Sequence, residues 1–131
     1  MNIKKKLVNS EELKKALGSV IKLYNSKQFE EALIKAKKLV KISPKESVLH
    51  NLIGLINVEK KNIKEGIKNF ELAIKYNQNF FVAHNNLANL YKNNKQIDKA
   101  ILYYKKAIKI NPKSAEIYNN LANLYKSDNK I

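Results

Sequence analysis

The sequence contains no cysteine and no arginine, and each absence excludes a class of chemistry. Without cysteine the chain can form no disulfide, thiol nucleophile or cysteine-ligated metal site. Without arginine it lacks the planar guanidinium that binds phosphates and base edges in bidentate fashion. All 26 basic residues are lysines, and the formal net charge is +15. We interpret this charge as a solvated lysine surface rather than a specific nucleic-acid interface.

Candidate catalytic groups are also scarce. Asp98 and Asp128 are the only aspartates, no Ser/His/Asp grouping occurs, and the three glycines form no phosphate-binding loop. His50 and His84 stand 34 residues apart, but no carboxylate or second histidine recurs beside either. Packing is therefore a better interpretation of these histidines than metal binding. We expect this segment to be non-catalytic, with no metal site and no cofactor.

No stretch of the sequence approaches the roughly 20 consecutive apolar residues that a membrane-spanning helix needs. The basic start of the chain turns polar at residues 9–12 without the apolar core of a signal peptide. We expect residues 1–12 to be a basic lead-in and the protein to be soluble and cytoplasmic, with no membrane span.

What the sequence has instead is an internal repeat. The run NNLANLY at residues 85–91 returns letter for letter at 119–125, an offset of 34 residues, and fainter copies begin at 51 and 17. A repeat of this length is typical of a solenoid in which each unit is a helix pair that cannot bury its apolar face alone. The expected units of this domain (13–131) are 13–46, 47–80, 81–114 and an incomplete 115–131, which suggests that the natural chain continues or was cut there.

The spacing of apolar residues and the turn residues predict where each helix begins and ends. The expected helices are one from a cap at Asn9 to about residue 24, and others at 29–42, 47–59, 63–76, 81–93, 97–110 and 115 to about 126. The predicted fold is therefore an all-α solenoid of antiparallel helix pairs, with three full repeats and one further helix.

The units resemble the tetratricopeptide repeat, whose motif places an aromatic, Leu-Gly or Leu-Ala, Tyr, Ala, a second aromatic, Ala and Pro at fixed offsets. The third unit carries His84, Leu87, Ala88, Tyr91, Ala100, Tyr104, Ala107 and Pro112 at these positions. The resemblance implies a right-handed superhelix whose first helices line a concave groove. Val20 replaces a small residue in the first unit, so that helix pair is expected to pack differently or splay. Gly66 holds a close-contact alanine position, so Gly66→Ala is expected to stabilise by about 0.5–1 kcal/mol.

The run at residues 83–91 resembles more specifically the repeats that precede the catalytic domains of O-linked N-acetylglucosamine transferase and of related bacterial glycosyl- and sulfotransferase-like proteins. In that family an asparagine at the place of Asn86 and Asn120 lines the inner groove and bonds the backbone of an extended peptide. Leu52 and Gly18 hold this place in the earlier units. The resemblance therefore implies a ladder of two asparagines.

The first helices of the third and fourth units carry asparagines at intervals of three and four residues, which places them on one helical face. An amide offers both hydrogen-bond donors and an acceptor, as a peptide backbone requires. The alternative is that an asparagine-rich chain puts this residue on any solvated face. The predicted peptide-binding groove consists of Asn85, Asn86, Asn89, Asn93, Asn119, Asn120, Asn123, Leu52 and Leu55.

Three functions follow as alternatives. The first, which the sequence favours, is a non-catalytic scaffold that binds a protein or an extended peptide in its groove. The second is the docking segment of a larger glycosyl- or sulfotransferase. The third is a basic protein that associates weakly with nucleic acid through lysine, without sequence specificity. Neither the ligand nor the oligomeric state follows from the sequence.

Overall fold

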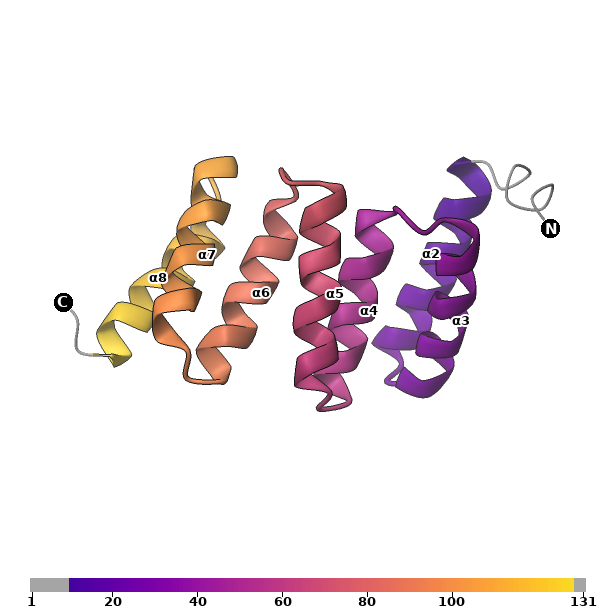
Figure 1. Ribbon diagram of the computed structural model, residues 1–131, viewed down its shortest axis with the longest axis horizontal. Coiled ribbons are helices and arrows are strands. Elements are labelled where there is room, and N and C mark those ends of the chain that lie inside the picture. The colour runs from indigo at the N-terminus through magenta and orange to yellow at the C-terminus, as the bar shows by residue number, and fades with distance from the viewer. Residues whose placement is uncertain (1–9, 129–131) are drawn as a thin grey trace.

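The computed structural model describes residues 10–128, which form seven α-helices and no strand (Figure 1). The helices are α2 (Ser10–Asn25), α3 (Phe29–Ile42), α4 (Ser47–Glu59), α5 (Ile63–Tyr76), α6 (Phe81–Asn93), α7 (Ile97–Ile110) and α8 (Ala115–Ser127). The expected bounds of α3 to α7 are confirmed, and α2 and α8 each extend one residue further than expected. Residues 10–12 of the expected lead-in form the first turn of α2, while residues 1–9, including the Asn9 cap, and the turn after residue 128 lie outside the described residues.

Each complete helix pair closes through the same turn. Lys27, Lys61 and Lys95 adopt positive φ angles of 62°, 65° and 61°, a left-handed conformation more often taken by glycine. The amide of the next residue then donates back five residues, as Gln96 does to the carbonyl of Tyr91 at 2.8 Å. This bond satisfies a carbonyl at the end of the first helix and reverses the chain direction.

The helix pairs stack side by side along the long axis of the molecule, with α2 at one end and α8 at the other (Figure 1). Each of α2, α4, α6 and α8 contacts the next of the four, whereas α3, α5 and α7 lie further from one another. The first helices therefore form the closely spaced inner face of the array, and the second helices form its outer face.

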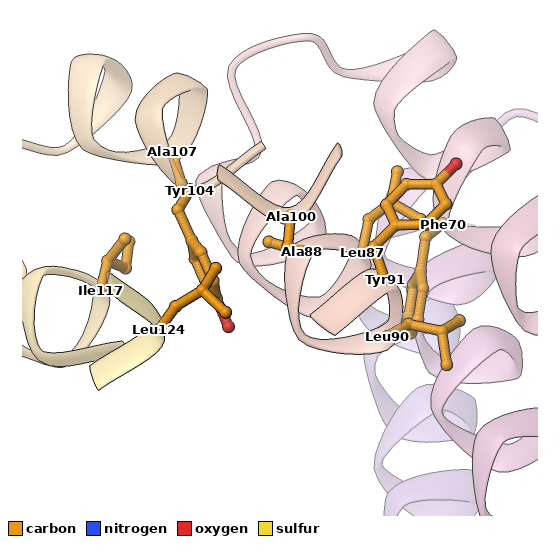
Figure 2. Packing of buried hydrophobic residues seen from close by; sticks show 10 residues of the cluster. All are labelled: Phe70, Leu87, Ala88, Leu90, Tyr91, Ala100, Tyr104, Ala107, Ile117 and Leu124. Atoms are coloured by element: carbon orange, nitrogen blue, oxygen red, sulfur yellow. The ribbon is translucent and has the colours of Figure 1, made fainter. Parts of the chain in front are cut away.

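The sizes of the buried residues determine how closely the helices pack in the core. Ala32, Ala88, Ala100 and Ala107 are fully buried, so that helix backbones approach closely, and Tyr104 fills the larger space between units. Figure 2 shows Tyr104 extending towards Leu124, while Phe70, Leu87, Leu90 and Tyr91 gather on the other side of α6. A second cluster among residues 10–128 joins α2, α3 and α4. An all-α tetratricopeptide-type solenoid, as the sequence predicts, is the observed architecture.

The first pair differs from the others in the expected direction. Val20 is fully buried, and α2 and α3 have fewer close backbone approaches than α4 with α5 or α6 with α7. A branched side chain at a position where the third unit has Ala88 holds the two helices further apart. The expectation that the first pair packs differently is confirmed.

The helix α8 leaves part of its apolar face uncovered among the described residues. Tyr118 is 46% exposed, whereas His84, which holds the same repeat position, is 5% exposed. Ala122 is likewise exposed, while Ala88 is fully buried. Across residues 10–128, no helix combines the length and apolar character that crossing a bilayer requires.

Candidate functional site

The predicted groove asparagines all lie on α6 and α8, two neighbouring helices of the inner face, but they differ in exposure. Asn93, Asn119 and Asn123 are exposed, Asn86, Asn89 and Asn120 are half-buried, and Asn85 is only 7% exposed. The structure therefore divides the predicted set into groups that face solvent and groups that lie beneath the surface. This division decides which amides remain available to a ligand.

Hydrogen bonds between neighbouring units fix two of these amides. The Nδ2 atom of Asn86 donates to Oδ1 of Asn51 at 3.0 Å, and Nδ2 of Asn120 donates to Oδ1 of Asn85 at 3.3 Å. Asn51 and Asn85 are each 7% exposed, so the bonds satisfy acceptors that solvent barely reaches. The same pairing thus links α4 to α6 and α6 to α8.

Each cross-unit bond uses only one of the hydrogen-bonding groups of the asparagine that donates it. A primary amide offers two N–H donors and a carbonyl with two lone pairs, and Asn86 uses one donor on Asn51. One N–H and the carbonyl of Asn86 remain, which are the two group types that bind a peptide unit. The bond also restricts the rotation of the amide, so these groups are held in place before any ligand arrives.

Sequence reasoning missed Asn51, which supplies the first acceptor of this series. A signal was present, because Asn51, Asn85 and Asn119 recur at one repeat position although the residue after them varies. The sequence predicts Asn85 and Asn119 of this series as groove residues. In the structure, Asn51 and Asn85 lie instead on the buried side of a contact between units.

Asn89 is also partly committed to the fold. Its Oδ1 accepts a hydrogen bond from the hydroxyl of Tyr104, a side chain with no exposed surface. Burial raises the pKa of Tyr104 to about 12, so the hydroxyl stays protonated and can donate throughout the neutral range. The amide hydrogens of Asn89 are left for other partners.

The two predicted leucines lie mainly in the core. Leu52 is 6% exposed and packs in the cluster that joins α2, α3 and α4, and Leu55 is half-buried against the other cluster, which contains Phe70 and Tyr104. Leu52, which the sequence predicts in the groove, therefore belongs to the core beneath the inner surface of α4. A role for Leu55 at the surface of the groove stays a prediction.

The inner face of the central units carries little charge. The helix α4 contains no lysine and α6 contains one, Lys92, whereas the outer helix α7 contains four. Among these helices, the lysines are thus concentrated on α7, away from the amides of α4 and α6. An inner face of this kind suits neutral hydrogen-bonding groups better than charged ones.

The two histidines pack at corresponding places in their units. Nε2 of His50 lies 2.7 Å from the carbonyl oxygen of Pro44, and Nε2 of His84 lies 3.0 Å from that of Gln78. The ring of His50 stacks on Tyr76 with centroids 5.4 Å apart. These contacts tie the start of each first helix to the end of the preceding unit.

Comparison with known proteins agrees with the repeat structure. Models of the tetratricopeptide repeat match residues 48–80, 81–114 and 103–131. No curated protein matches the chain.

Similar solved structures include the first TPR of Spaghetti (RPAP3) bound to the HSP90 peptide SRMEEVD, with a TM-score of 0.82 and 16% identity over 91% of this chain and 94% of that one. The crystal structure of MamA has a TM-score of 0.81 and 21% identity over 95% of this chain and 74% of that one. The structure of Naa15/Naa10 bound to HypK-THB has a TM-score of 0.74 and 28% identity over 85% of this chain, and the match spans 17% of that chain.

Proposed function

Because residues 48–131 belong to the tetratricopeptide-repeat family, we propose that the chain is a protein-binding scaffold whose inner face holds an extended peptide. The observation that carries the proposal is the pair of cross-unit bonds that orient Asn86 and Asn120. Each amide retains a donor and an acceptor, and the two stand one unit apart on the inner face. They form two rungs that bond the backbone of a strand laid across α6 and α8.

The charge distribution favours recognition of backbone over recognition of side-chain charge. With Lys92 the single lysine of α4 and α6, the central inner face offers few partners to an acidic ligand. The similar array of Spaghetti was solved with a peptide bound, which supports a peptide as the class of ligand. We expect affinity to depend little on the ligand side chains beside the two rungs.

The test compares two double variants that break the same cross-unit bonds. Asn86→Ala with Asn120→Ala removes the rungs themselves, whereas Asn51→Ala with Asn85→Ala removes their buried acceptors and leaves the rungs in place. Each pair loses two hydrogen bonds and is expected to reduce the free energy of unfolding by about 1–3 kcal/mol in total. Equilibrium unfolding in urea measures this loss, and it is expected to be similar for the two variants.

The two double variants are expected to differ in their affinity for a peptide. A peptide selected from a random library against the wild-type protein is titrated calorimetrically at a temperature where all the variants are folded. Loss of the rungs is expected to weaken binding by about 1–3 kcal/mol, because backbone groups of the ligand are left without partners. Loss of the acceptors is expected to cost less than half of that. Equal affinity of the wild-type protein and the Asn86→Ala/Asn120→Ala variant would show that these two asparagines do not bind the peptide.

Two finer functions stay predictions. The asparagine run supports a docking segment of a glycosyl- or sulfotransferase, and the coding sequence downstream of residue 131 tests it directly. Weak binding of nucleic acid through the outer lysines is tested by its salt dependence, since counterion release makes such binding fall steeply with added salt.

A further inference from the structure

A cleft of about 340 Å³ opens on the side of the array formed by the second helices, between the ends of α5 and α7 and the first turn of α6. None of the groove asparagines contributes to it. Its lining includes three lysines, two isoleucines and a histidine, namely Lys75, Lys106, Lys109, Ile74, Ile110 and His84.

The charges of this cleft are unbalanced. Three ammonium groups border it and no carboxylate lines it. None of the three lysines takes part in the ion pairs of Lys60 with Glu30 and of Lys68 with Glu65. Nζ of Lys106 is held 4.8 Å from the ring centroid of Tyr103. Like charges brought together in this way repel each other, and an anion placed among them relieves the repulsion.

His84 adds a second unsatisfied group. Its Nε2 bonds the carbonyl oxygen of Gln78, which can only accept, so in the neutral ring the hydrogen is on Nε2 and Nδ1 has a free lone pair. Nδ1 is buried without a hydrogen-bond partner, in a side chain that is 5% exposed. A buried polar atom without a partner is rare in a folded protein and points to a site whose occupant is a ligand or a proton.

We propose that this cleft binds a carboxylate or phosphate group carried on an apolar body, with the anion among Lys75, Lys106 and Lys109 and the body between the two isoleucines. The site is separate from the peptide groove, and its ligand class follows from the three lysines and two isoleucines that line it.

Binding at this cleft is coupled to protonation of His84. Burial lowers the pKa of His84, and the nearby charge of Lys106 lowers it further. The other charged or titratable groups beside it are Lys75 on α5, and Lys109 and Tyr103 on α7, with Glu71 of α5 next to Tyr103. A bound anion offsets the lysine charges and raises the pKa of His84, so affinity is expected to increase as the pH falls.

The preceding unit provides an internal comparison. One repeat earlier, His50 replaces His84, but Leu72 stands in the place of Lys106, and Tyr76 in the place of Ile110. The ring of Tyr76 stacks on His50. Val40 also stands in the place of Ile74, so this place lacks the third lysine and both isoleucines. We expect the imidazole signals of His50 to stay unchanged when ligand is added.

The binding test uses benzoate and phenyl phosphate as probes and benzamide as the uncharged control, followed by calorimetry and by the imidazole signals in NMR. Lys75→Gln/Lys106→Gln/Lys109→Gln removes the three cleft charges. Lys37→Gln/Lys38→Gln/Lys41→Gln removes the same charge from α3 and is the matched control. All six lysines are exposed, so both variants are expected to keep the helical content of the wild type.

The cleft variant is expected to bind the anions at least about tenfold more weakly, and the α3 variant to differ from wild type by less than about twofold. Whichever anion binds more tightly identifies the headgroup. An equal loss of anion affinity in both variants would show non-specific attraction to a basic protein. Binding of benzamide as tight as that of the anions would show that the cleft is only an apolar pocket. Either result overturns the proposal.

The coupling is tested by titrating His84 by NMR with and without saturating benzoate, whose carboxylate stays ionised throughout the histidine titration. Its pKa is expected to rise in the presence of benzoate. An unchanged pKa together with unchanged His50 signals would mean that benzoate does not occupy this cleft.

Discussion

At the scale of the residue, one amino acid performs two tasks on adjacent positions of one helix. Asn85 is buried and accepts a hydrogen bond from Asn120, whereas Asn86 is half-buried and donates one to Asn51. The difference is one step along the helix, about 100° of rotation, which carries a side chain from the contact between units to the inner surface. The recurring Asn-Asn pair is therefore a structural residue followed by a candidate binding residue.

Tyr104→Phe tests the contribution of a single buried hydroxyl. It removes the bond to Asn89 without changing the ring that fills the core, so the free energy of unfolding is expected to fall by about 0.5–1.5 kcal/mol at neutral pH. Tyr118→Phe, which removes a hydroxyl from a side chain that is 46% exposed, is expected to have little effect. Urea unfolding measures both, and similar losses would contradict a specific role for the buried bond.

The same variant has a signature in alkaline solution. The pKa of Tyr104 is raised from 10.0 to about 12 in the folded protein, so the neutral side chain stabilises the fold fully below pH 10. This contribution is lost as the pH rises through about 12, because the charged form is buried. Wild-type protein is therefore expected to lose more stability than Tyr104→Phe over that interval.

At the scale of the element, the glycines show how closely two helices of a pair approach. A methyl group at Gly54 would lie 2.6 Å from the buried ring of Phe70, whereas one at Gly18 would meet nothing within 4 Å. A methyl group at Gly66 would lie 3.1 Å from Cγ2 of Val58 and 3.3 Å from Cδ2 of Leu90. The expected gain from Gly66→Ala is thus opposed by contacts that the sequence did not reveal.

Gly18→Ala and Gly54→Ala form a matched pair of opposite sign. Gly18→Ala is expected to increase the free energy of unfolding by about 0.5–1 kcal/mol, through helix propensity and a less flexible unfolded chain. Gly54→Ala is expected to decrease it by about 1–3 kcal/mol, because Phe70 is enclosed and must shift. Chemical denaturation of both variants measures these changes. Stabilisation by Gly54→Ala would mean that α4 and α5 are less tightly packed around Gly54 than the structure shows.

At the scale of the whole molecule, stability is expected to vary along the array. In a solenoid each unit contacts only its neighbours, so an end unit has half of the contacts of a central one. The first unit is further weakened because α2 and α3 approach less closely than the later pairs. The array is therefore a row of coupled units rather than one uniform core.

Amide hydrogen exchange measures this gradient. Residues 10–42 are expected to exchange at least about tenfold faster than α5 and α6, since their local opening breaks fewer buried contacts. The experiment is performed where exchange reports opening equilibria. Uniform protection from α2 to α7 would show that the array opens only as a whole and would contradict a weak first unit.

The sequence by itself determined the period, the helix bounds and the places where helices come close, because each depends on local propensity and on spacing within one unit. The predicted bounds of α3 to α7 and the different packing of the first pair follow from such local rules. The tertiary structure alone decided the partners between units. Asn51 meets Asn86 and Asn85 meets Asn120 at a separation of 35 residues, one more than the period, because the unit-to-unit placement brings adjacent helical positions together. The lysine cleft between α5 and α7 has the same origin, since no local pattern brings together Lys75, His84 and Lys106.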